Sequence, residues 1–171
     1  MAAPGYLARL SGFIKEVLAI QSSAGVADAA KVIATDATGR LDSSFLPLGV
    51  GADIQTILTS EDLAAQDLVN IWNDSGTIKC RKADADSAAK RAHGFVKAAT
   101  TSGQNADIYA GGEITGLTSK TPGATQWLSK TAGQMTETPP TGAGVISQQI
   151  GWAVDATVVQ CDLSEPVELA A

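Results

Sequence analysis

Apolar and polar residues alternate with two different periods along this chain. Between residues 6 and 20 the apolar side chains recur every three to four positions, which is the spacing of a helix with one apolar face. Because an isolated helix of this length is marginal in water, it needs a surface to dock on, either in the same chain or in another one. The apolar positions of this expected amphipathic helix are Leu7, Leu10, Phe13, Ile14, Val17 and Leu18.

The stretch that follows, up to residue 51, has few core-forming residues for its length. Residues 22–25 end the helical pattern, residues 31–34 are a short β-like run, and residues 36–39 have the composition of a turn. Such a segment is typical of an arm that lies along a partner. We therefore expect residues 1–51 to be an N-terminal helix and extended attachment arm, whose further interface side chains are Leu41, Phe45, Leu46 and Pro47.

From about residue 52 the period changes to two, which is typical of strands. Residues 68–72 and 77–81 flank the turn signal Asn-Asp-Ser-Gly at positions 73–76, which predicts a hairpin. Residues 94–99 predict a short strand, and the alternation over residues 107–115 predicts another.

The last alternating segment predicts a second hairpin. Its first strand places Ile146, Ile150, Trp152 and Val154 on one face, and the returning strand places Val159, Cys161 and Leu163 inward. Short strands separated by Gly and Pro turns predict that residues 52–171 form a β-rich domain. The expected fold class is mainly β, a small antiparallel β-barrel or sandwich with an N-terminal amphipathic helix and extended arm.

The net charge of −6 argues against a nucleic-acid partner, because phosphate binding needs a basic face. Half of the basic residues nevertheless lie in one short stretch, either as a solvated mixed-charge surface or as a patch for an acidic partner. The sequence has no signal-peptide pattern and no apolar run long enough for a membrane span, so we expect synthesis in a cytoplasm and no membrane partner. The clustered basic residues are Lys79, Arg81, Lys82, Lys90, Arg91 and Lys97.

Residues that could carry chemistry are few, and each has a structural explanation. His93 has no nucleophile motif beside it, so we expect no catalytic role. Cys80 and Cys161 lack metal-site spacing and are expected to be buried free thiols. The sequence therefore predicts a protein that is not an enzyme and that holds no cofactor and no metal.

The acidic pairs also have structural explanations. Asp84, which with Asp86 forms an Asp-Ala-Asp sequence, is expected to belong to a turn into a short Ala-rich helix. Glu61 and Asp62 are expected to favour the start of another short helix. The three tryptophans are expected to pack in the core or at its rim, and a carbohydrate or protein contact site becomes credible if two of them are exposed together. They are Trp72, Trp127 and Trp152.

Two segments resemble structural proteins of tailed bacteriophages. Residues 27–47 read ADAAKVIATDATGRLDSSFLP and are similar to segments of head decoration proteins and of the start of tail fibres. Residues 116–118, 122–125, 128–129, 138–140 and 149–153 follow the order of short motifs in a C-terminal module of phage virion proteins. The chain departs from that pattern in the insertion Ser119-Lys120-Thr121 and in Trp127, where Tyr is commoner.

This resemblance implies a capsid decoration or cement protein on the outer surface of a virion. It implies as partners the major capsid protein and neighbouring copies of the chain, as a homotrimer or a dimer, and no cofactor. One alternative is a tail fibre, collar or baseplate-associated protein that takes part in host adsorption. Another is a carbohydrate-binding or enzymatic module, which the tryptophans alone suggest.

Overall fold

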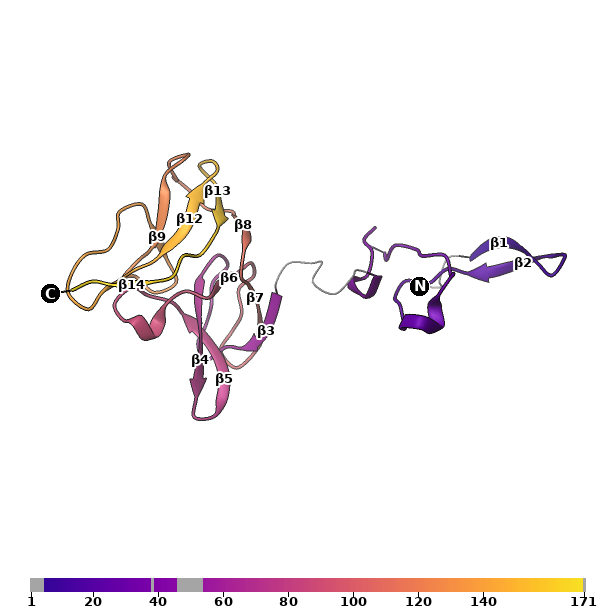
Figure 1. Ribbon diagram of the computed structural model, residues 1–171, viewed down its shortest axis with the longest axis horizontal. Coiled ribbons are helices and arrows are strands. Elements are labelled where there is room, and N and C mark those ends of the chain that lie inside the picture. Colours follow the sequence, from indigo (N-terminus) through magenta and orange to yellow (C-terminus); the bar gives the residue numbers. More distant parts are fainter. Residues whose placement is uncertain (1–4, 38, 46–53, 171) are drawn as a thin grey trace. The chain divides into compact units, whose positions relative to one another are not determined.

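The computed structural model describes residues 5–37, 39–45 and 54–170, and its secondary structure is almost entirely strand (Figure 1). Contacts between Cα atoms divide the chain into two compact units, residues 1–51 and residues 52–171. The coarse expectation of a mainly β, antiparallel fold is confirmed. In the part of the chain that is described, no helix has the length and apolar character needed to cross a membrane.

The N-terminal unit begins with a hairpin, so the expected amphipathic helix over residues 6–20 is wrong. Strands β1 (Gly5–Leu10) and β2 (Phe13–Leu18) pair antiparallel from Gly5 opposite Leu18 to Leu10 opposite Phe13. Ser11 and Gly12 link them with φ angles of 52° and 85°, the positive values that a two-residue hairpin turn requires. The apolar spacing that suits a helix also suits two short strands, and the turn residues decide between the two.

The rest of the described N-terminal unit is mostly irregular. It contains two single-turn 3-10 helices, η1 (Gly25–Asp28) and η2 (Ser43–Phe45). The β-like run at residues 31–34 contributes one isolated parallel bridge, between Ile20 and Ile33. Short side-chain bonds hold the turns, including the Arg40 amide donating to the Asp36 carboxylate at 3.0 Å.

The first sheet of the β-domain has five strands in the order β3-β7-β6-β4-β5, all antiparallel. The expected hairpin at residues 68–81 is confirmed as β4 and β5, joined by Ser75 and Gly76 at positive φ. The strands are β3 (Ile54–Leu58), β4 (Leu68–Asp74), β5 (Thr77–Lys82), β6 (Gly94–Val96) and β7 (Asn105–Tyr109).

The second sheet has the order β10-β9-β12-β13-β8, and its pairings are nested along the chain. The inner strands β9 and β12 pair with each other, and β8 and β13, which flank them in sequence, are also partners. Both five-stranded ladders are open, with an edge strand at each end. The strands are β8 (Gly112–Thr115), β9 (Thr125–Leu128), β10 (Met135–Thr136), β12 (Gln149–Ala153) and β13 (Val158–Cys161).

The single strand expected over residues 107–115 is wrong, because the chain changes sheets within it. β7 pairs with β3 and β6 in the first sheet, whereas β8 pairs with β13 in the second. Ala110 and Gly111 form the crossing. A short two-stranded pairing of β11 (Ile146–Ser147) with β14 (Val167–Glu168) brings the C-terminal segment back to the domain.

One hydrophobic cluster joins the two sheets. It includes Leu68 and Phe95 from the first sheet and Ile114, Ile150 and Val159 from the second, all fully buried. A second cluster lies on the other side of the first sheet and is built from Leu63, Val69, Cys80, Val96, Ala106 and Ile108. The β-domain thus has its own core, while Ala19 is the one buried apolar side chain among the described residues of the N-terminal unit.

A β-bulge corrects the expected face of the last hairpin. Two residues of β12, Ile150 and Gly151, lie opposite the single residue Gln126 of β9. Ile150 is fully buried, as expected, but Trp152 is 43% exposed instead of lying on the same inner face. The extra residue reverses the alternation, so that every side chain after it changes face.

Candidate functional site

The hairpin β1–β2 carries four large apolar side chains that are mostly in solvent. Leu7, Ile14, Phe13 and Leu18 are 74, 75, 70 and 60% exposed. A two-stranded hairpin in water is marginally stable at best, because it has no second layer to cover its side chains. An apolar surface of this kind marks a contact with another molecule.

The register of the hairpin assigns these side chains to faces. Leu7 opposite Glu16 and Ile14 opposite Arg9 lie on one face together with Leu18, since cross-strand partners point the same way. Both charged residues of this face are exposed, as are its apolar ones. The face therefore combines apolar anchors with one charge of each sign, a composition that suits a protein partner.

The other residues predicted for the interface lie in different environments. Leu41 is 54% exposed. Val17 and Phe45 are half-buried within the N-terminal unit. The side chain of Leu10 and the residues Leu46 and Pro47 lie outside the described part of the chain, so their place in an interface stays a prediction. Sequence reasoning missed Val26, a 93% exposed apolar residue of η1.

The clustered cations are neutralised within the chain. Three of the lysines form ion pairs, namely Lys79 with Asp74 at 2.8 Å, Lys82 with Asp67 at 3.3 Å and Lys90 with Asp84 at 2.8 Å. The guanidinium of Arg81 lies 4.5 Å from the ring centre of Trp72, and the ammonium of Lys97 lies 4.5 Å from that of Tyr109. These contacts favour a mixed-charge surface over a patch for an acidic partner.

His93 has a structural role. Its Nδ1 accepts a hydrogen bond of 2.8 Å from the backbone amide of Ile71 in the neighbouring strand β4. Burial, and secondarily the positive charge of Arg91, lower the pKa of His93 below the usual 6.5. The imidazole is thus an acceptor that ties the segment before β6 to β4.

The acidic residues singled out in the sequence stabilise loops. Asp84 is buried, and its carboxylate accepts a hydrogen bond of 3.2 Å from the amide of Asp86, so it forms the turn that was expected. This turn leads into the 3-10 helix η3 (Ala88–Lys90). The helix expected at Glu61 and Asp62 is wrong, because these carboxylates accept hydrogen bonds from the amides of Lys82 and Ser102.

Cys80 and Cys161 are both buried and free, as expected. They belong to different hydrophobic clusters, one on each side of the first sheet. Burial raises the pKa of the Cys161 thiol to about 12 and also raises that of Cys80. The thiols are therefore protonated at neutral pH and suited to packing, not to nucleophilic chemistry.

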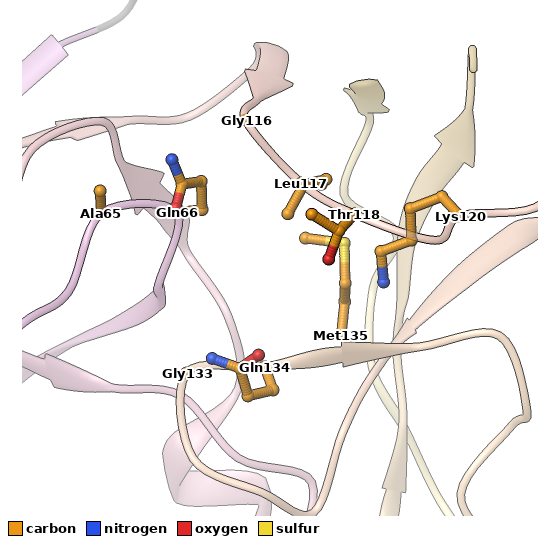
Figure 2. Close-up of a pocket in the computed structure, with 9 residues that line it drawn as sticks. All are labelled: Ala65, Gln66, Gly116, Leu117, Thr118, Lys120, Gly133, Gln134 and Met135. Atoms are coloured by element: carbon orange, nitrogen blue, oxygen red, sulfur yellow. The ribbon is translucent and has the colours of Figure 1, made fainter. Parts of the chain in front are cut away.

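A polar hollow of about 220 Å³ lies in the β-domain (Figure 2). Figure 2 shows the amide side chains of Gln66 and Gln134 facing Thr118 and Lys120 across it. Burial lowers the pKa of Lys120, although the nearby carboxylate of Glu137 opposes that shift. The described residues that line the hollow include no carboxylate, imidazole or thiol, so they offer hydrogen bonds but no acid–base pair. Within the described residues, no group of three metal-ligating side chains comes together.

The three tryptophans divide into two kinds. Trp72 is half-buried in the first sheet under the guanidinium of Arg81. Trp127 is half-buried and Trp152 is exposed, and both belong to the second sheet. A comparison with protein-family models found no match for this sequence, and a comparison with curated proteins found none either.

Proposed function

We propose that this chain is a structural component of a bacteriophage virion that binds the outer capsid surface and stabilises the head. The observation that carries the proposal is the exposed apolar hairpin Gly5–Leu18, attached to a β-domain that has its own core. The phage-like segment at residues 27–47 lies between the two and directs the proposal to a virion. On this proposal the two open sheets of the β-domain act as a small sandwich displayed on the particle.

Attachment on this proposal is by burial of apolar area. Covering Leu7, Ile14 and Leu18 on a capsid surface would contribute on the order of 25 cal/mol per Å² of apolar area removed from water. Contacts with the major capsid protein and with neighbouring copies, in a trimer or a dimer, add to this gain over a lattice. No enzyme activity and no cofactor is part of the proposal.

The first test is the position of the chain in an electron-microscopy map of the virion that carries it. We expect many copies on the outer capsid surface and capsids that break at lower temperature when the gene is deleted. A few copies confined to the tail, with adsorption lost and capsids unaffected, would contradict the proposal and favour the tail-fibre, collar or baseplate alternative.

A second test addresses the hairpin directly. The variant L7S/I14S/L18S removes the apolar anchors of one face, and we expect it to lose binding to capsids that lack the protein, as measured by co-sedimentation. The matched control I54S/I78S/V167S replaces three exposed apolar residues of the β-domain, which are 45, 55 and 62% exposed, and is expected to bind normally. Equal binding of both variants would show that the hairpin is not the attachment element.

A further inference from the structure

The outer face of the second sheet carries a row of four side chains at one level. Glu113 of β8 is the register partner of Gln160 in β13, which in turn is the partner of Trp152 in β12. Trp152 is also the partner of Thr125 in β9. Strands lie about 4.8 Å apart, so the row is about 14 Å long. Glu113 and Trp152 are exposed, while Gln160 and Thr125 are half-buried.

A second row runs beside the first. Trp127 lies two residues after Thr125 on β9, and its partners are Gln149 of β12 and Thr136 of β10. All three side chains are half-buried. Each row therefore sets one indole between side chains that donate and accept hydrogen bonds.

The bulge in β12 is what brings Trp152 to this face. Gly151 has a φ of 150° and lies so close to β13 that a Cβ would stand 1.8 Å from the carbonyl oxygen of Gln160. Only glycine fits such a position, and bulges commonly re-aim a side chain next to a binding site. Without the extra residue, Trp152 would point inward with Ile150.

The core does not need the indole of Trp152. Ile150, Ala153, Val159 and Cys161 fill the inner side of this part of the sheet, and each is at most 3% exposed. Trp72 shows the contrasting case, since the guanidinium of Arg81 covers its ring. An uncovered indole flanked by amide, hydroxyl and carboxylate groups is the composition of a ligand surface.

We propose that this face, built from β9, β12, β13 and β8, binds a neutral or N-acetylated oligosaccharide. The apolar C–H face of a sugar ring packs on the indole of Trp152, which buries apolar area. The hydroxyl groups at the rim of the ring donate to and accept from Gln160, Glu113 and Thr125. Glu113 is the one ionisable side chain in the two rows, and the chain has a net charge of −6, so an anionic sugar is disfavoured.

The test uses the full chain on an array of neutral, N-acetylated and anionic oligosaccharides, followed by calorimetric titration of the strongest hits. We expect binding to neutral or N-acetylated probes, at least tenfold weaker in Trp152→Ala. The variant Trp72→Phe, on the other sheet, is the control and is expected to bind normally. Because the Trp152 side chain is exposed, circular dichroism and the melting temperature of Trp152→Ala should match those of the wild type.

Four results would overturn the proposal: no binding on the array, binding to anionic probes alone, binding unchanged in Trp152→Ala, or self-association in sedimentation velocity that this substitution abolishes. The last result would assign the face to a second copy of the chain. The outcome does not depend on the capsid proposal, since the titration needs no virion.

Discussion

Gly151 shows how a single residue determines the surface of a sheet. The bulge at this position turns Trp152 outward while keeping Ile150 in the core, and both effects follow from one inserted backbone unit. An alternation pattern read from the sequence cannot detect the insertion, because Gly contributes no side chain to the pattern. That is why Trp152 was expected on the wrong face.

The substitution Gly151→Ala is expected to destabilise the β-domain by about 3 kcal/mol or more, because its Cβ would collide with the backbone of β13. The control Gly103→Ala also has a positive φ, of 79°, but nothing lies within 4 Å of its Cβ. It should cost only about 1 kcal/mol. Urea unfolding followed by circular dichroism measures both values, and equal losses would show that the bulge tolerates a side chain.

His93 predicts a pH dependence of stability. Its pKa is lowered in the folded protein, so the unfolded chain binds a proton more readily. The stability it contributes is present above the unfolded pKa of 6.5 and is lost as the pH falls through and below that value. We expect the free energy of unfolding to decrease between pH 7 and pH 5, and to decrease less in His93→Gln. An identical pH profile for the variant would exclude this linkage.

Several residues could be placed from the sequence because local chemistry determines them. Asp84 was expected in a turn, and Cys80 and Cys161 were expected to be buried free thiols, and the structure agrees. Glu61 and Asp62 were misplaced because an acidic pair stabilises a loop as readily as a helix N-terminus. Their amide donors, Lys82 and Ser102, are distant in sequence, so no local pattern reveals them.

At the scale of elements, the N-terminal segment could not be assigned from its apolar spacing. Positions 7, 10, 14, 17 and 18 satisfy a helical period, yet they also occupy two six-residue strands around Ser11 and Gly12. The hairpin β4–β5 was predicted correctly because its turn signal is stronger. The single strand over residues 107–115 failed for a tertiary reason, since β7 and β8 find partners in different sheets.

The hairpin β1–β2 should contribute little to the unfolding of the chain on its own. Phe13 is 70% exposed, so Phe13→Ala is expected to change the free energy of unfolding by no more than about 0.5 kcal/mol. Phe95 is fully buried and stacks on Tyr109 with ring centres 5.6 Å apart. Phe95→Ala should therefore cost about 3–5 kcal/mol. Similar losses in guanidinium unfolding would mean that the hairpin is already covered in the free protein.

At the scale of the whole molecule, the chain assigns different work to its two units. Residues 52–171 bury two hydrophobic clusters, whereas the described part of residues 1–51 buries almost no apolar side chain. The change of composition near residue 52 is visible in the sequence, and contacts divide the chain at the same place. What the sequence could not provide is the strand order, because the partners of β8 and β13 are separated by more than forty residues.

The nested pairing of the second sheet has a consequence for synthesis on the ribosome. β9 and β10 are adjacent in sequence and emerge early, but β8 must wait for β13 before either of its edges gains a neighbour in that sheet. During that interval Ile114, fully buried in the finished domain, has no cover from its partner strand. A chain released before residue 161 would keep this strand unpaired, so premature termination should yield aggregates instead of a smaller folded domain.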